Sequence, residues 1–213
     1  MKERPILFKG EMVRAILDGR KTQTRRVVKK PVDEWRIVAF NFQGASGRNY
    51  VLLQDADRTY RGFPCPYGKP GDQLWVREKH AICGPNVWYA AECDNAPAWE
   101  VCEYPDGSNY DGKWRPSIHM PRWASRITLE VTGVRVEGVQ DITDRDALFE
   151  GIDYYAPPKN SEAYGAWDMM SPSEGFMHLW DSINGKKYPW ESNPFVWVVE
   201  FKRMAQESTG VTL

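Results

Sequence analysis

The sequence predicts a mixed α+β fold in which a barrel-like sheet is flanked by a few short helices. Several segments show the alternation or the apolar runs of strands, whereas helical periodicity is confined to three short stretches. Clusters of glycine and proline separate these segments. Because 213 residues suffice for one substantial core and are few for two, we expect a single domain over residues 1–203 and a flexible tail over 204–213.

The expected strands share β-branched and aromatic residues between turn signals. The strongest covers residues 125–140, where Ile127, Leu129 and Val131 fall on one face and Gly133 marks a bulge or bend. The other expected strands are residues 4–8, 35–40, 50–53, 73–78, 86–92 and 195–201.

Three helices are expected, each ending at a glycine. The first covers 10–17 and ends at Gly19, because glycine readily adopts the left-handed conformation of a helix C-terminus. The second covers 142–151 with Thr143 as its N-cap, and the third is an amphipathic helix over 173–184. The irregular connections include a Gly- and Pro-rich loop over 61–71 and loop insertions near 94–116 and 153–172, the last with the length and aromatic content of a lid.

Charge and cysteine content exclude several classes of protein. The net charge of −1 lacks the basic excess of proteins that coat nucleic acid, although a local basic cleft or a neutral nucleoside substrate agrees with it. Without an export signal or a membrane span, the sequence predicts a cytoplasmic protein with reduced thiols and no membrane partner. The cysteines and histidines lack metal-ligand spacing, and nucleotide-binding motifs are missing. We therefore expect no metal, no cofactor and no obligate protein partner.

The polar loop after the first helix contains the first candidate catalytic residues. Lys21 and Thr24 are three residues apart, so that a turn can bring the amine to the hydroxyl. A hydroxyl becomes a good nucleophile when a base removes its proton, and a lysine can be that base when burial or nearby cations lower its pKa. Arg20, Arg25 and Arg26 supply such cations. The competing interpretation is a solvated basic turn.

Two further segments carry candidate site residues. Glu78 ends the predicted strand 73–78, where it can pair with Lys21 and pass protons, or can be a surface carboxylate paired with Arg77 or Lys79. Residues 114–126 combine tryptophans suited to stacking with arginines suited to phosphate or carbonyl oxygens, which predicts a ligand-facing segment or, equally, a Trp-anchored structural loop. The candidate substrate contacts are Trp114, Arg115, His119, Arg122 and Trp123, together with Arg26 and Trp75.

The pattern Gly19-x-Lys21-x-x-x-x-Arg26 resembles the signature of the ASCH domain family, which has a PUA-like β-barrel fold. The acidic residue often found between the lysine and the arginine is replaced by Thr24, as in the subgroup of ASCH proteins that hydrolyse N4-acetylcytidine. The segments 5–8, 114–126, 179–184 and 197–201 resemble those of a phage- and prophage-encoded branch of this family. The resemblance therefore covers most of the chain.

This resemblance implies a metal-free amidohydrolase that cleaves the N4-acyl amide of cytidine-like nucleosides to cytidine and a carboxylate. The lysine and threonine of the subgroup's catalytic set map onto Lys21 and Thr24, and Glu78 is the best match for its downstream glutamate. Thr24 or a water would attack the acyl carbon, Lys21 would take the proton, and Glu78 would position Lys21 and protonate the leaving amine. Arg26 or a backbone N–H would stabilise the oxyanion.

Two other hypotheses stay open at this point. One is an RNA-binding PUA-like module, or a ribonuclease, in which Lys21 and four arginines hold phosphates while tryptophans stack on bases. Its arginines are Arg25, Arg26, Arg115 and Arg122. The other is a phage structural or assembly protein without an active site.

Overall fold

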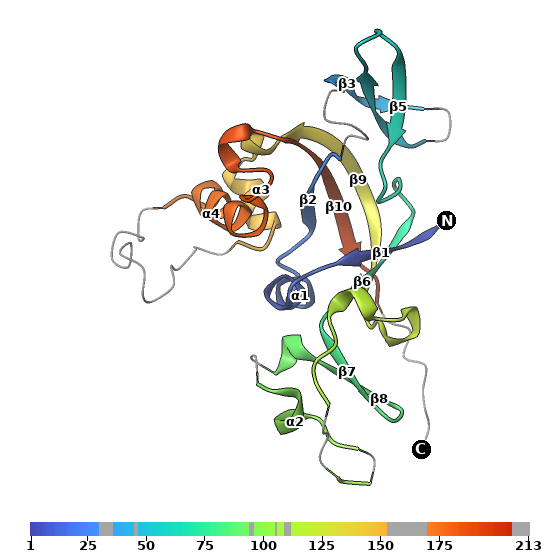
Figure 1. Cartoon of the computed structure of the whole chain (residues 1–213), viewed down its shortest axis with the longest axis vertical. Helices are drawn as coiled ribbons and strands as arrows, with labels where there is room; N and C mark the ends of the chain where they lie inside the picture. The colour runs from blue at the N-terminus through green and yellow to red at the C-terminus, as the bar shows by residue number, and fades with distance from the viewer. Residues whose placement is uncertain are drawn as a thin grey trace. The chain divides into compact units, whose positions relative to one another are not determined.

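The computed structural model shows a mixed α+β fold (Figure 1). It describes residues 1–29, 36–44, 47–93, 96–104, 106–108, 112–152 and 170–205. Within these residues ten strands form three sheets, and the helices are few and short. The largest sheet has the strand order β1-β6-β9-β10-β2, a second has the order β3-β4-β5, and β7 pairs with β8. The predicted α+β class is confirmed, whereas closure of a PUA-like barrel stays a prediction.

The chain divides into two compact units. The first unit contains Met1–Gly19, Asp72–Glu130 and Lys202–Leu213, and the second contains Arg20–Gly71 and Val131–Phe201. That residues 1–203 act as a single domain stays a prediction.

In the first unit, β1 runs parallel to β6, and β6 runs antiparallel to the start of β9. Leu74 and Val76 of β6 are buried, while Trp75 is half-buried, as the alternation of the sequence predicts. Val13 and Ile16 form the buried stripe of α1. The elements of this unit are β1 (Glu3–Leu7), α1 (Gly10–Leu17), β6 (Gln73–Arg77), β7 (His80–Cys83), β8 (Asn86–Tyr89), η1 (Ala90–Glu92), α2 (Ala98–Val101), η2 (Ser117–His119), η3 (Arg122–Ala124) and the first residues of β9 (Thr128–Gly138).

In the second unit, β2 runs antiparallel to β10, and β3, β4 and β5 form an antiparallel sheet. One face of β2 and β10 is covered by α3 and α4, where Phe176 and Trp180 pack against Val196 and Val198 (Figure 1). The elements of this unit are β2 (Gln23–Val27), β3 (Arg36–Gln43), β4 (Asn49–Gln54), β5 (Tyr60–Pro64), η4 (Val139–Asp141), α3 (Asp144–Phe149), α4 (Pro172–Asn184), η6 (Trp190–Ser192) and β10 (Phe195–Arg203), with the remainder of β9.

The helix ends follow the capping signals of the sequence. The Thr143 side chain accepts a hydrogen bond from the Asp146 backbone N–H, which confirms the predicted N-cap of α3. Gly19 and Gly151, which follow α1 and α3, have φ values of 76° and 86°, a region that favours glycine. Ser171 caps α4 in the same way as Thr143 caps α3.

Several local predictions are wrong because tertiary pairing decides them. Residues 23–26 of the expected polar loop form β2 together with Val27, and this strand gains its hydrogen bonds from β10. Residues 60–64 and 80–83, which composition does not mark as strands, pair with β4 and β8. Residues 90–92 of an expected strand are a 3₁₀ turn, and 98–101 of an expected irregular segment are helical.

Residues 153–169 and 206–213, where a lid and a flexible tail are expected, lie outside the described part of the chain, as does residue 35. In the part that is described, no helix combines the length and apolar character needed to cross a membrane.

Candidate functional site

The backbone of Thr22 anchors the segment that carries Lys21. Its N–H donates to the carbonyl of Phe149 at 2.8 Å, and its carbonyl accepts from the N–H of Phe201 at 2.8 Å. These two bonds hold Lys21 beside the C-terminal end of α3, where its side chain is only 1% exposed. Burial of this degree contradicts the interpretation of the segment as a solvated basic turn.

Glu150 is the carboxylate that contacts the Lys21 amine. Lys21 Nζ lies 2.6 Å from Glu150 Oε2 and 2.8 Å from the Glu150 carbonyl oxygen. Burial lowers the pKa of Lys21 below its ordinary value, while the charge and hydrogen bond of Glu150 oppose that change. A lysine whose pKa is lowered has its neutral, proton-accepting form at a lower pH than an ordinary lysine does.

The same carboxylate also binds Arg25. Arg25 Nη1 donates to Glu150 Oε1 at 3.2 Å, and Arg25 Nη2 donates to Glu137 Oε1 at 2.6 Å. The Arg25 guanidinium is fully buried and packs over the ring of Phe176, 5.7 Å from its centroid. Glu150 is therefore fixed between two buried cations. It was missed by sequence reasoning, which offered Glu78 as the partner of Lys21.

The face of β2 that lies opposite to the Arg25 side chain carries Thr24 and Arg26. In the antiparallel register, Thr24 faces Val199 and Arg26 faces Trp197, and facing residues point to the same side of a sheet. Thr24 is buried, and burial also lowers the pKa of Arg26, against the charges of Tyr67 and Glu150. The candidate nucleophile and a cation thus share one face, next to Trp197.

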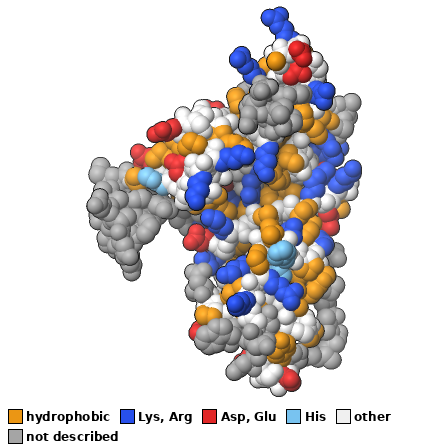
Figure 2. Space-filling view, in the orientation of Figure 1, with side chains coloured by type: hydrophobic (Ala, Val, Ile, Leu, Met, Phe, Trp, Pro, Cys, Tyr) orange, Lys and Arg blue, Asp and Glu red, His pale blue; other side chains and the backbone are white. Residues whose placement is uncertain are grey.

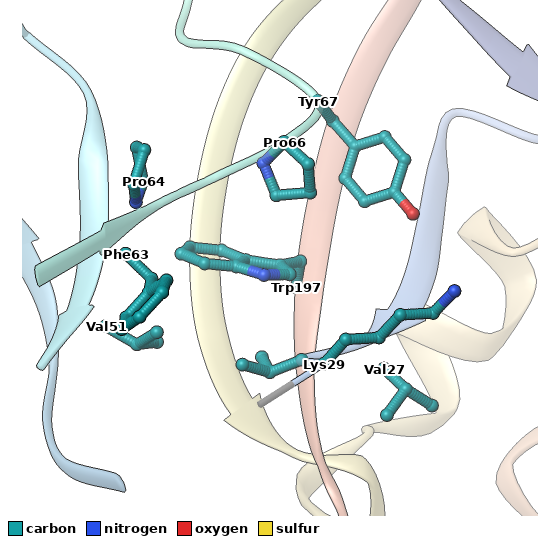
Figure 3. Close-up of a pocket in the computed structure, with 9 residues that line it drawn as sticks. Val27, Lys29, Val51, Phe63, Pro64, Pro66, Tyr67 and Trp197 are labelled. Atoms are coloured by element: carbon teal, nitrogen blue, oxygen red, sulfur yellow. The ribbon is translucent and has the colours of Figure 1, made fainter. Parts of the chain in front are cut away.

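A cavity of about 350 Å³ opens beside Trp197 (Figure 3). Its volume lies in the range of roughly 300–1,000 Å³ that is typical of small-molecule sites. Figure 3 shows the Tyr67 hydroxyl and the Lys29 amine pointing to one end and Val51 and Phe63 at the other. The lining residues are Val27, Val28, Lys29, Val51, Phe63, Pro64, Pro66, Tyr67 and Trp197. None of them is among the predicted substrate contacts; the aromatic and proline run 63–67 was the signal that could have found them.

Glu78 lies in the first unit and is buried. Arg126 holds it in a bidentate pair, with Nε 3.0 Å from Oε1 and Nη2 3.1 Å from Oε2. Arg126 also pairs with Glu92 and lies over the ring of Tyr89, 3.9 Å from its centroid. Burial raises the pKa of Glu78, although Arg126 opposes the change. The interpretation of Glu78 as a surface carboxylate is wrong, and its meeting with Lys21 and Thr24 stays a prediction.

Within residues 114–126, the two tryptophans differ in their surroundings. The Trp114 indole N–H donates to the Ala96 carbonyl at 2.8 Å and packs against the buried cluster around Cys83 and Cys102, as a structural anchor does. Trp123 is 66% exposed. Arg115 and His119 are also exposed. Figure 2 shows many basic and few acidic side chains on the face of the described residues in view.

Trp75 and Arg122, also predicted as substrate contacts, are neighbours in the first unit. The guanidinium carbon of Arg122 lies 5.9 Å from the Trp75 ring centroid, and that of Arg77 lies 5.4 Å away. Arg122 pairs with Glu3 at 2.8 Å. Substrate contact by these residues stays a prediction.

Metal-ligating side chains do not gather in the part of the chain that the structure describes: it contains no group of three or more His, Cys, Asp or Glu residues able to hold an ion. The four cysteines are free thiols, and burial is the main cause that raises the pKa of Cys102 to about 12. A thiol with so high a pKa is a poor nucleophile.

Comparison with known proteins matches no family model, no curated protein and no solved structure. The resemblance to the ASCH family therefore rests on residues of this sequence, foremost Lys21, Thr24 and Arg26. Membership of that family stays a hypothesis.

Proposed function

We propose that the protein is a metal-independent amidohydrolase that cleaves the N4-acyl amide of N4-acetylcytidine-like nucleosides, giving cytidine and a carboxylate. The observation that carries the proposal is the buried amine of Lys21, whose pKa is lowered and which precedes the buried Thr24 by three residues. A desolvated lysine is a usual general base, and a threonine hydroxyl needs such a base to act as a nucleophile. The motif resemblance supplies the substrate class, and a PUA-like barrel around the site is part of the proposal.

In the proposed reaction, the Thr24 oxygen attacks the acyl carbon while Lys21 Nζ takes the hydroxyl proton, and the approach of this amine to the Thr24 hydroxyl is part of the proposal. Arg26, on the same strand face as Thr24, stabilises the negative charge on the acyl oxygen. The bond between the acyl carbon and N4 then breaks, and N4 receives a proton. Water hydrolyses the acyl-threonine ester to release the carboxylate. In the variant with water as the nucleophile, Lys21 deprotonates that water and no ester forms.

Two carboxylates have separate roles in this mechanism. Glu150 fixes the direction of the Lys21 amine through its 2.6 Å contact and is a positioning residue. Glu78, with a raised pKa, is suited to hold the proton that N4 receives. Its placement beside the substrate is part of the proposal.

The test is incubation with N4-acetylcytidine and chromatography of the released cytidine. We expect Lys21→Met, Thr24→Val and Glu78→Gln each to lower the rate at least about 10²-fold, a typical contribution of one group in acid–base catalysis. Lys186→Met, which changes an exposed lysine of the same unit, is the matched control. An inert wild-type protein that is folded, or a Lys21→Met variant as active as the control, would contradict the proposal.

The exposed Trp123, which is next to Arg122 in the chain and in the same segment as the exposed Arg115, favours RNA binding as the second candidate function. That function predicts binding to single-stranded RNA that weakens steeply with salt and is lost in Trp123→Ala. Thr24→Val would then have no effect. A ribonuclease would in addition shorten the RNA on a gel.

A further inference from the structure

The cavity beside Trp197 combines an apolar space with a cationic end. Its walls are formed by Trp197, Phe63 and Val51, while the Tyr67 hydroxyl and the Lys29 amine share one end (Figure 3). Aromatic walls of this kind bind planar rings by stacking and by excluding water. The described lining residues include no carboxylate.

The polar end is suited to an anion. Lys29 is exposed and has no ion pair among the residues that the structure describes, so its charge is available to a ligand. The Tyr67 hydroxyl is a second donor at the same end. Arg26, which faces Trp197 across the strands and interacts electrostatically with Tyr67, adds positive potential. An ammonium and a phenol that converge next to an aromatic wall match a phosphate or carboxylate attached to a ring-bearing ligand.

We infer that this cavity binds a nucleoside monophosphate, with the base between Trp197 and Phe63 and the phosphate at Lys29 and Tyr67. This inference rests on the proposed function for the identity of the base. It deepens that function by making the preferred substrate an N4-acylated cytidine monophosphate instead of the neutral nucleoside.

Calorimetric titration of the full chain with cytidine 5′-monophosphate, cytidine and inorganic phosphate tests the inference without any hydrolysis. We expect the monophosphate to bind at least about tenfold more tightly than cytidine, since a charge-assisted hydrogen bond is added. Lys29→Met should remove this preference and leave the affinity for cytidine unchanged, whereas Lys186→Met should change neither. Phe63→Leu, which keeps an apolar side chain but removes the ring, should weaken the binding of both cytidine and its monophosphate.

Equal affinities for cytidine and its monophosphate in the wild-type protein would overturn the inference. So would a Lys29→Met variant that keeps the preference for the monophosphate. Monophosphate binding that depends on Lys29, together with no hydrolysis of either N4-acetylated compound, would contradict the amidohydrolase alone. Hydrolysis of N4-acetylcytidine without any phosphate preference would contradict only the inference drawn here.

Discussion

Two buried ion-pair clusters of this protein are centred on groups of opposite charge. In the second unit the carboxylate of Glu150 lies between two cations, Lys21 and Arg25, and Arg25 also pairs with Glu137 and Asp146. In the first unit one cation, Arg126, lies between two carboxylates, Glu78 and Glu92. Because an arginine keeps its proton at any ordinary pH, the amine of Lys21 is the basic group that can titrate in one cluster, whereas the other offers only carboxyl groups.

Burial acts on these two titratable groups in opposite directions. It lowers the pKa of Lys21 and raises the pKa of Glu78, since desolvation disfavours the charged form of each, and the ionic partners only reduce the changes. A lowered pKa extends the pH range in which the Lys21 amine is neutral and can accept a proton, and a raised pKa extends the range in which the Glu78 carboxyl can donate one. Under the proposed function, these directions suit Lys21 to the role of the base and Glu78 to the role of the acid.

The largest expected effect comes from removing the carboxylate that two cations share. Glu150→Gln should lower the free energy of unfolding by about 3 kcal/mol, because it takes the charged partner away from the buried Lys21 while Arg25 keeps Glu137. Urea unfolding at neutral pH measures this change. Glu191→Gln, which alters an exposed carboxylate, should stay within about 0.5 kcal/mol of wild type. Equal effects of the two variants would show that the cluster does not contribute to stability.

Removing the Glu78 carboxylate of the first unit should lower the free energy of unfolding by less than Glu150→Gln does. Glu78→Gln leaves Arg126 with Glu92, and the Arg126 side chain is 17% exposed, so that water can solvate part of its charge. We expect a loss of about 1–3 kcal/mol, the usual cost of one lost hydrogen bond to a charged group. The same urea titration measures it, and a loss larger than that of Glu150→Gln would reverse the comparison.

The pH dependence of stability distinguishes a titrating amine from a permanent cation. Because the pKa of Lys21 is lower in the folded than in the unfolded protein, the unfolded chain holds more protons between the two pKa values. Stability should therefore rise with pH across this window, which ends near the ordinary lysine pKa, by at most about 1.4 kcal/mol per pH unit. Unfolding of the wild-type protein and of Lys21→Met between pH 7 and 10 gives the contribution as a difference. A difference that falls with pH would contradict the lowered pKa.

The sequence predicts those elements whose signals are local. Strands β6 and β9 follow from alternation, β10 follows from an apolar run, and α3 follows from Thr143 at its start and Gly151 behind its end. These features depend on residues within a few positions of one another, which is the range that periodicity and capping describe. Lys21 as a catalytic base stays a prediction.

The parts of the fold and of the candidate site that the sequence does not predict depend on residues that are distant from one another in the chain. Glu150 is 129 positions from Lys21, and no spacing rule connects the end of α3 with the segment before β2. The cavity draws Trp197 from β10 and Phe63 from β5, a strand that exists because it pairs with β4. Composition shows that aromatic residues are present, but only the sheet register shows which of them share a face.

An exposed pair gives the smallest expected effect and separates burial from geometry. Glu3 and Arg122 form a bidentate pair of the same kind as Glu78 and Arg126, with distances of 3.1 and 2.8 Å, but both side chains are 43% exposed. If burial is what makes the two clusters strong, Glu3→Gln should change the free energy of unfolding by less than about 1 kcal/mol, and the change should shrink further in high salt. Urea unfolding at low and high salt, beside Glu78→Gln, measures both. A loss as large as that of Glu78→Gln would mean that bidentate geometry, with or without burial, determines the strength of these pairs.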